Sequence, residues 1–175
     1  MSPLLSLLIF LASSVALVLV FWPRSGLVAR LSRYRRLEER VLIEDTLKHL
    51  YNCEYAGRRA TEESLAGFLE TSVGHAVRTL ARAEELGFLR FEGLEPVLTK
   101  EGQQYALRVL RAHRLLERYM ADRTGVAPVA WHAEADRLEH TLSRDEAEGL
   151  ASRLGHPLYD PHGDPIPTAA GGIPP

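Results

Sequence analysis

The pattern of apolar and polar positions divides the sequence into an apolar beginning and a longer amphipathic remainder. Residues 3–22 carry no charge, and an α-helix of ~20 apolar residues crosses the ~30 Å hydrocarbon core of a bilayer. Arginines follow from Arg24 onward and no Lys or Arg precedes the segment, so the positive-inside rule places the N-terminus outside. The pattern predicts one transmembrane helix and a single-pass location in the inner (cytoplasmic) membrane, with the other residues in the cytoplasm.

A cleaved signal peptide is the competing interpretation of the same segment. Such a peptide has a basic n-region, a shorter apolar core and a small-x-small cleavage site. Here no basic residue stands at the start, and Phe21, Trp22 and Pro23 stand where small residues are needed. We therefore expect an uncleaved anchor.

Beyond this segment, apolar positions at helical spacing predict a helix-turn-helix. They recur from Leu37 to about Ala56, and Gly57 is expected to end this first helix. Two short helices follow, one capped by Thr61 and the next opened near Ser72. Two short helices joined by a tight turn are the helix-turn-helix pattern.

The next segments predict a wing and three further helices. Two short apolar runs, 88–91 and 96–98, flank a Gly turn and indicate a β-hairpin. Thr99, Pro128 and Ser143 then stand where the three helices are expected to begin, the last with a capping box. The sequence thus predicts a mainly α protein built around a winged helix-turn-helix.

Composition and charge narrow the choice of chemistry. Hydrophobic residues make up 46% and charged residues 25%, the profile of a globular protein. The net charge of −2 gives no general attraction to nucleic acid, so any DNA-binding surface must be local. Cys53 is the only cysteine, which excludes an intrachain disulfide and a cysteine-rich zinc site.

Imidazole and carboxylate side chains recur at helical spacing in the last third of the chain. Each pair alone is usually a solvated surface pair, but together they follow directly after the predicted wing. Nitrogen and oxygen ligands without a thiolate suit Mn(II), Fe(II) or Zn(II) rather than Cu(I). The set comprises His113 and Glu117 on one predicted helix, and His132, Asp136, Glu139 and His140 on one face of the next.

With these motifs the chain resembles the iron-dependent repressors of the diphtheria-toxin-repressor type, including the manganese transport regulators. The resemblance runs from about residue 39 to residue 168. It is carried by Leu47-x3-Tyr51, Leu98-Thr99-x2-Gly102, His113-Arg-Leu-Leu-Glu117, His132-x3-Asp136-x2-Glu139-His140 and Gly163-Asp-Pro-Ile-Pro167.

The resemblance implies a winged helix-turn-helix followed by a helical metal-binding and dimerisation domain, and hence a homodimer. The expected organisation is a transmembrane anchor at 1–23, a basic juxtamembrane linker at 24–36, the winged helix-turn-helix at 37–99, the metal-binding and dimerisation helices at 100–156, and a Pro/Gly-rich tail at 157–175.

The resemblance also implies two neighbouring metal sites. Glu139 and His140 match the shared core of the primary site. Asp136 and Asp45 stand where iron-type members have Cys and Met, and where manganese-type members have Glu and Asp. This exchange of sulfur for oxygen shifts the preference toward Mn(II). Lys48 stands where manganese members often have a second first-helix carboxylate, so that ligand is missing.

The second site and the cofactor follow from the same comparison. His113, Glu117 and His132 match the ancillary site of iron-type members, while manganese-type members use the His113 position in the primary site. The ligand set is a hybrid, and the expected cofactor is a divalent transition metal, Mn(II) or Fe(II). A metal that joins Asp45 to the dimerisation region would fix the orientation of the DNA-binding unit in advance.

The predicted DNA-reading helix departs from the family. Ser72, His75, Arg78 and Arg82 are the candidate DNA contacts, and a solvated helix face is the alternative interpretation of the same residues. Gly74 replaces a small hydroxyl residue that can contact phosphate. The wing has acidic rather than basic residues near its tip, and acidic side chains repel phosphate.

Two functions remain in competition. The first is a metal-dependent (Mn/Fe) transcriptional regulator that binds DNA and is tethered to the membrane. The alternative is a metal-sensing dimerisation module that regulates a membrane metal-ion transporter without binding DNA. An enzyme is not expected, because the sequence offers no nucleophile–base pair and no Gly-rich phosphate loop, and the ligand set resembles a closed site.

Overall fold

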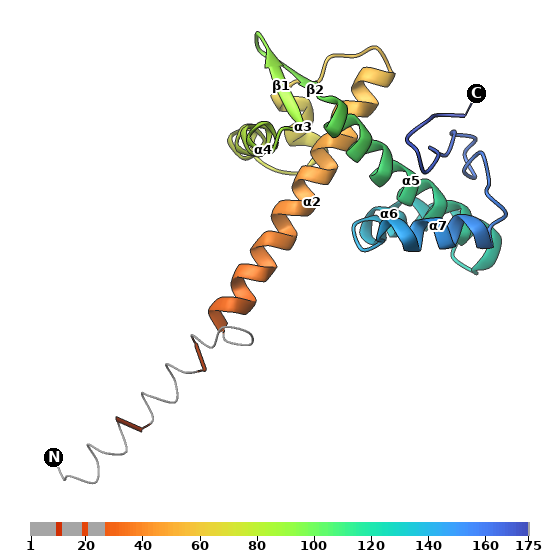
Figure 1. The fold of residues 1–175 in the computed structure, drawn as a ribbon, viewed down its shortest axis with the longest axis horizontal. Coiled ribbons are helices and arrows are strands. Elements are labelled where there is room, and N and C mark those ends of the chain that lie inside the picture. The colour runs from red at the N-terminus through yellow and green to blue at the C-terminus, as the bar shows by residue number, and fades with distance from the viewer. Residues whose placement is uncertain (1–9, 12–18, 21–26, 175) are drawn as a thin grey trace. The chain divides into compact units, whose positions relative to one another are not determined.

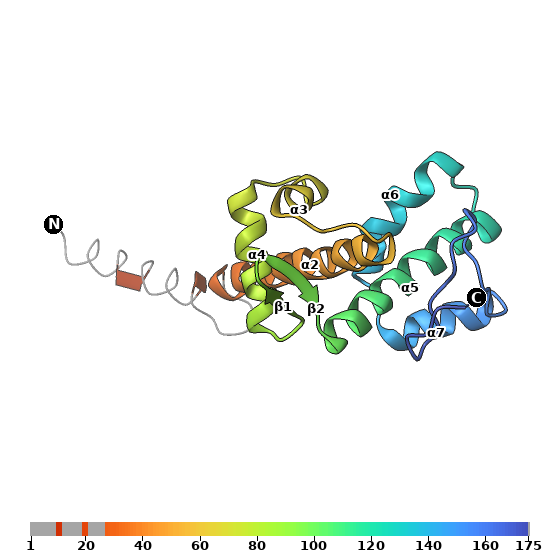
Figure 2. The same ribbon diagram turned by 90° about the horizontal axis from the view of Figure 1, so that it is seen from above.

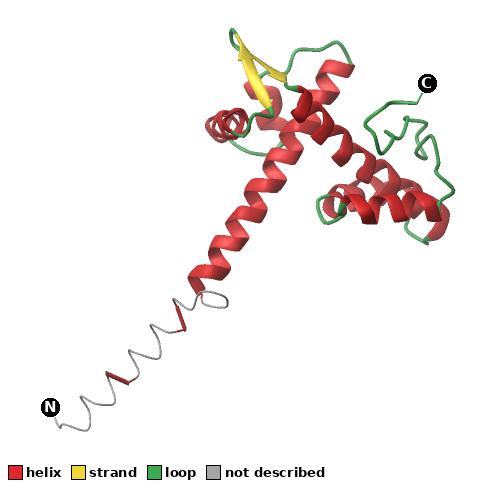
Figure 3. Ribbon diagram, viewed as in Figure 1, coloured by secondary structure: helices red, strands yellow, loops and turns green. Residues whose placement is uncertain are grey.

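The computed structural model describes residues 10–11, 19–20 and 27–174, and this part of the chain is mainly helical. Figure 3 shows the helices together with a single small antiparallel sheet. Residues 1–41 and 42–175 form two separate units, and the second unit contains every residue of the candidate site. The predicted fold class, mainly α with a winged helix-turn-helix, is confirmed for the described residues.

The predicted membrane location needs correction. Most of segment 3–22 lies outside the described residues, and within 10–11, 19–20 and 27–174 no helix is both long and apolar enough to cross a bilayer. Helix α2 (Leu27–Tyr55) has the length, with 29 residues, but arginines and glutamates recur along it. This finding contradicts the predicted single-pass location with the N-terminus outside. The alternative function, which required a membrane transporter as partner, loses its support as well.

Helix α2 also begins earlier than the apolar pattern indicates. It starts at Leu27, whereas the pattern predicts a start at Leu37, so the expected basic linker over 24–36 is helical from Leu27 onward. Leu, Ala and Arg, which are frequent in this segment, favour the helix intrinsically.

The winged helix-turn-helix is formed as predicted. Helix α3 (Glu62–Phe68) is capped by Thr61, and helix α4 (Val73–Glu85) by Ser72. Strands β1 (Leu89–Glu92) and β2 (Glu95–Leu98) pair antiparallel and form the wing. Gly93 has a φ of +67° at the tip of this hairpin, a conformation that favours glycine.

Three helices follow the wing. Thr99 caps helix α5 (Lys100–Arg123), which extends from the wing to helices α6 (Pro128–Glu139) and α7 (Arg144–Arg153) in both Figure 1 and Figure 2. Ser143 and Glu146 form the predicted capping box of α7. The starting points of all three helices were therefore readable from local sequence.

The start of α5 lies in close contact with the wing. A Cβ atom built on Gly102 would stand 1.8 Å from the carbonyl oxygen of Phe88. Thr99 also binds backbone here, because its hydroxyl donates to the Gly87 carbonyl at 2.7 Å. The motif that joins Thr99 and Gly102 thus fixes the wing to the helix that carries the site.

Helix α5 connects two hydrophobic cores. The first core belongs to the winged helix and combines Leu47 of α2 and Leu80 of α4 with Leu110 of α5. The second core joins Leu115 of α5 to α6, α7 and the tail, where Ile166 is buried. His113 lies on α5 between the segments that serve the two cores, so the candidate site occupies the junction of the two packed regions.

Candidate metal centre

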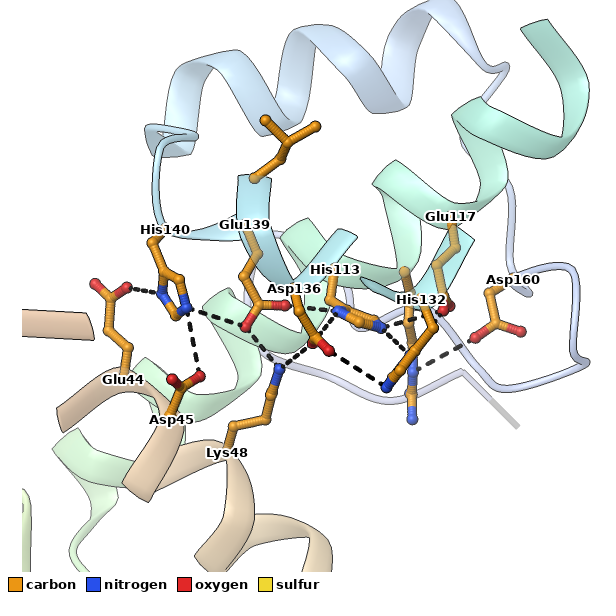
Figure 4. Close-up of polar contacts among 12 residues, drawn as sticks. Glu44, Asp45, Lys48, His113, Glu117, His132, Asp136, Glu139, His140 and Asp160 are labelled. Carbon is orange, nitrogen blue, oxygen red and sulfur yellow. Dashed lines mark hydrogen bonds and ion pairs between the residues drawn. The ribbon is translucent and has the colours of Figure 1, made fainter. Parts of the chain in front are cut away.

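The candidate ligands come from helices α2, α5 and α6 and point toward one another in Figure 4. Residues Glu44 to Lys48 lie within the same compact unit as α5 and α6. Three overlapping groups have ligand atoms within 4.8 Å of one another. These groups are Asp45, Glu139 and His140; His113, Asp136 and Glu139; and His113, Glu117 and His132.

The first group links α2 to the end of α6. His140 Nε2 lies 3.4 Å from Asp45 Oδ1 and 3.6 Å from Glu139 Oε1. On its other side, His140 Nδ1 is 2.6 Å from Glu44 Oε2, while the Tyr105 hydroxyl donates to Glu44 Oε1 at 2.6 Å. Glu44 therefore orients the imidazole so that Nε2 faces Asp45 and Glu139, as outer carboxylates do for metal-binding histidines.

The central group is arranged around the buried side chains of His113 and Glu139. His113 Nδ1 lies 2.6 Å from Glu139 Oε2 and 3.2 Å from Asp136 Oδ1. Lys48 enters from α2, and its Nζ donates to Glu139 Oε1 at 2.7 Å and to Asp136 Oδ1 at 2.9 Å. Lys48, His113 and Glu139 are buried, whereas the Asp136 side chain is 43% exposed, so two cations and two carboxylates neutralise one another at the edge of the protein interior.

The third group extends toward the surface. Glu117 Oε1 is 3.2 Å from His113 Nε2 and 3.1 Å from His132 Nδ1. Glu117 is buried, whereas the side chain of His132 is 71% exposed. A ligand could therefore reach this group from solvent on the His132 side.

Two histidines of the cluster, His113 and His140, favour their protonated forms. Burial lowers the pKa of His113, but hydrogen bonds to Asp136, Glu117 and Glu139 outweigh burial and raise it to about 10. Burial likewise lowers the pKa of His140, and Asp45 and Glu44 outweigh it and raise it to about 9. A metal ion would have to displace these protons.

The pKa values of the lysine and of two carboxyl groups are shifted by the same ion pairs and hydrogen bonds within the cluster. Burial lowers the pKa of Lys48, but Glu139 and Asp136 more than compensate and hold it above its ordinary value. Burial raises the pKa of Asp136, and hydrogen bonds from His113 and Lys48 reverse the shift, so the carboxyl titrates below its usual range. Burial also raises the pKa of Glu117, and the hydrogen bonds and charges of His113 and His132 outweigh burial and lower this pKa.

Sequence reasoning missed two residues of this centre. Glu44 pairs with His140 across 96 positions, and no local pattern marks it. His162, in the tail, places its Nε2 3.7 Å from Glu117 Oε1 and thereby adds a third imidazole to the third group, beside His113 and His132. Buried Asp160 holds this tail turn, because its Oδ1 accepts from the backbone N–H groups of His162 and Asp164. The only available signal for His162 was its place beside the Gly163 motif.

The donor chemistry fits a divalent transition metal. The groups offer imidazole nitrogens and carboxylate oxygens, the ligands that Mn(II), Fe(II) and Zn(II) share. All seven predicted ligand residues lie in these groups. One feature does not fit a centre in which every group holds a metal ion. The Lys48 ammonium already forms ion pairs with Asp136 and Glu139, two of the ligand residues.

The predicted DNA-contacting residues lie on helix α4, away from this cluster in sequence and in their contacts. Ser72 is the N-cap, and its hydroxyl accepts from the His75 backbone N–H. The His75 ring is 3.2 Å from the Thr71 hydroxyl, and Arg82 forms an ion pair of 2.8 Å with Glu85. Arg78 is exposed.

The wing carries acidic residues that are matched by nearby arginines. Arg90 binds Glu92 at 2.6 Å, and Arg59 lies 3.5 Å from Glu95. All four side chains are well exposed to solvent. The wing is therefore locally neutralised rather than a strong repeller of phosphate.

A winged helix joined by one long helix to a cluster of imidazoles and carboxylates is the arrangement of metal-responsive winged-helix regulators. Residues 99–168 match the family model described as "Iron dependent repressor, metal binding and dimerisation domain". The predicted resemblance to the iron-dependent repressor family is thereby supported over the helices that carry the site.

Named relatives extend the similarity into the winged helix. The chain is 37% identical over 122 residues to the iron-dependent repressor IdeR of Mycobacterium leprae (strain TN), covering 69% of this chain and 53% of that protein. It is 34% identical over 127 residues to the diphtheria toxin repressor of Corynebacterium efficiens, covering 71% and 54%. The chain thus spans about half the length of the curated relatives it matches.

Solved structures agree with this similarity. A manganese-dependent transcriptional repressor in complex with manganese superposes with a TM-score of 0.71 at 31% identity, over 76% of this chain and 62% of that one. The manganese regulator SloR gives a TM-score of 0.68 at 27% identity, over 75% and 61%. These relatives are named as repressors and regulators, which at the family level agrees with the prediction that the chain is not an enzyme.

Proposed function

We propose that this protein is a metal-dependent transcriptional regulator, a homodimer whose winged helix binds DNA more tightly when Mn(II) or Fe(II) is bound. The similarity to iron- and manganese-dependent repressors, and the match to a metal binding and dimerisation domain, support the class of metal, the dimer and the DNA partner. The observation that carries the proposal is the approach of Asp45, on α2, to Glu139 at the end of α6 and to His140 directly after it.

The ligand assignment follows the groups. Asp45, Glu139 and His140 form the site that couples α2 to α6, and Asp136 stands beside it. His113, Glu117 and His132 form the second site. A bound divalent ion supplies positive charge that carboxylates from different helices can share.

The residues of the chain turn this binding into a change of DNA affinity. Leu47 and Leu50 of α2 are buried in the core of the winged helix. Asp45 lies on the same helix, so whatever holds Asp45 against His140 also orients the winged helix relative to α5 and α6. A protein whose DNA-binding orientation is already selected pays less to bind, and its apparent affinity rises.

Helix α4 is the proposed DNA-reading element. Its buried positions Ala76, Leu80 and Ala83 pack against the core, which leaves Arg78 and Arg82 on the exposed face. Arginines on such a face contact phosphates and base edges in a major groove. Ser72 and His75, at the start of the helix, complete the proposed contact set.

The proposal is tested by DNA binding with and without metal. Duplexes are first selected from a random-sequence pool by the wild-type protein in Mn(II), and binding is then measured by fluorescence anisotropy in Mn(II) and in EDTA. We expect at least about tenfold tighter binding in Mn(II). Asp45→Ala should lose this gain, whereas Asp122→Ala, which removes an exposed carboxylate paired with Arg118, should keep it. Equal wild-type affinities in Mn(II) and EDTA would contradict the proposal.

A further inference from the structure

Lys48 places a lysine ammonium inside the cluster of metal-type ligands (Figure 4). Its Nζ lies 2.7 Å from Glu139 Oε1 and 2.9 Å from Asp136 Oδ1, and its side chain is 7% exposed. Lysines are almost never buried to this degree unless they are paired. The space between the two carboxylates is therefore built for a cation, and the chain itself supplies one.

The two partners of Lys48 belong to the central group. That group consists of His113, Asp136 and Glu139, and a metal held there would draw on the same two carboxylates. Ligand oxygens lie at ~2.0–2.2 Å from a bound transition-metal ion. A metal ion and the Lys48 ammonium would then stand within about 5 Å of each other, and like charges repel strongly in such buried surroundings.

The flanking groups meet less of this obstacle. Among the contacts of the described residues, Lys48 binds two of the three ligand residues in the central group but only Glu139 in the group of Asp45, Glu139 and His140. It binds none in the group of His113, Glu117 and His132. Lys48 therefore opposes the binding of a divalent ion at the central group more than at either flanking group. It also joins α2 to α6, because the lysine comes from the first helix and both carboxylates from the second.

We propose that Lys48 is a fixed, protein-borne cation at the central group, so that divalent ions bind only at the flanking groups. In the metal-free protein the same ammonium ties α2 to α6. This inference rests on the proposed function in one respect, since it takes the flanking groups to be metal sites. We therefore expect fewer bound metal ions per chain than there are ligand groups. We also expect the ion pairs of Lys48 to hold α2 against α6 in the metal-free protein.

The first test counts bound metal. The 175-residue wild-type chain, Lys48→Glu and Lys48→Gln are equilibrated with Mn(II) alone, and bound Mn(II) per chain is measured by equilibrium dialysis and elemental analysis. Lys48→Glu adds a carboxylate to the central group, and Lys48→Gln removes its resident charge, so each should bind about one more ion than wild type. Lys100→Glu and Lys100→Gln, at an exposed lysine of α5, are the matched controls and should leave the count unchanged.

The outcomes separate this inference from the proposed function. Wild type that binds Mn(II), with no gain in either Lys48 variant, overturns the inference and leaves the proposed function standing. A gain in the variants over a wild type that binds none supports the inference and removes the proposed function. No binding by any of the proteins removes both.

The second test needs no metal. In EDTA, Lys48→Gln should lower the thermal midpoint by at least about 4 °C relative to Lys100→Gln, because it leaves buried Glu139 without its ammonium partner. Equal midpoints for the two glutamine variants would overturn the proposed tie between α2 and α6.

Discussion

The metal-type cluster and the DNA-reading surface differ in how their charges are held. In the cluster, buried groups from three helices bind partners far away in sequence, such as Lys48 with Glu139 and Glu44 with His140. On the winged helix, exposed arginines pair with neighbours a few positions away, as Arg82 does with Glu85. The first arrangement depends on the tertiary fold, whereas the second needs only a local helix or hairpin.

This difference predicts where each region is sensitive. Breaking a buried ion pair leaves an uncompensated charge and costs several kcal/mol, whereas exposed pairs contribute little. Changes in the cluster should therefore alter stability and metal binding together. Changes on the surface of α4 should alter DNA binding while stability remains nearly constant.

The largest effect on stability is expected at Gly102, where the winged helix packs against α5, rather than at the charged residues of either region. Gly102→Ala would place a Cβ 1.8 Å from the Phe88 carbonyl oxygen, so backbone must move. We expect a loss of about 3 kcal/mol or more in the free energy of unfolding, measured by urea denaturation. Gly67→Ala, a helical glycine with open space around it, is the control and should change stability by no more than about 1 kcal/mol. A Gly102→Ala protein as stable as this control would show that the wing is not rigidly seated.

The next effect tests the buried cluster directly. Glu139→Gln removes the carboxylate that Lys48 and His113 share, and both cations stay buried. In EDTA the free energy of unfolding should fall by roughly 3 kcal/mol. Glu134→Gln removes a carboxylate of the same helix from an exposed pair with Arg137 and should cost less than about 0.5 kcal/mol. Similar losses in the two variants would erase the contrast between buried and exposed charge.

A smaller effect follows from the protonated histidines. The pKa of His113 is raised from 6.5 to about 10 and that of His140 to about 9. A raised pKa contributes stability that is fully present below about 6.5 and is lost as pH rises through the folded-state values. Metal-free protein should therefore lose stability, on the order of 2 kcal/mol, between pH 6.5 and 9 in urea denaturation.

Matched histidine variants assign this pH dependence to the cluster. The titratable groups around these two rings are Glu44, Asp45, Lys48, Glu117, His132, Asp136 and Glu139. His140→Gln should flatten the slope, and His156→Gln, at an exposed position, should not. Stability that stays constant or increases over the same pH interval would contradict the assignment of this pH dependence to the two histidines.

The elements of the fold were predictable because their signals are local. Thr61, Ser72, Thr99 and Ser143 cap their helices with their own side chains, and Gly93 marks the turn of the wing. Each of these depends on a few neighbouring residues. The beginning of α2 escaped prediction because the arginines over 24–36 were interpreted as a basic linker rather than as part of the helix.

The candidate site was predictable only in part. Helical spacing is enough to group His132, Asp136 and His140, but Asp45 entered through family resemblance alone. Glu44 and His162 were missed, since their contacts join distant segments of the chain. Lys48 was noticed as a missing carboxylate, and its role as a cation between two carboxylates required the three-dimensional arrangement.

The smallest effect on stability is expected on α4, and it sharpens the comparison most. Arg82→Gln removes an exposed arginine paired with Glu85, and Arg137→Gln removes one paired at the same spacing with Glu134 on α6. Both should change the free energy of unfolding by less than about 0.5 kcal/mol. Only Arg82→Gln should lower the slope of log affinity against log salt for DNA, by about one, because only this arginine is proposed to replace a counterion on phosphate. Equal slopes for the two variants would place the DNA contact outside this part of α4.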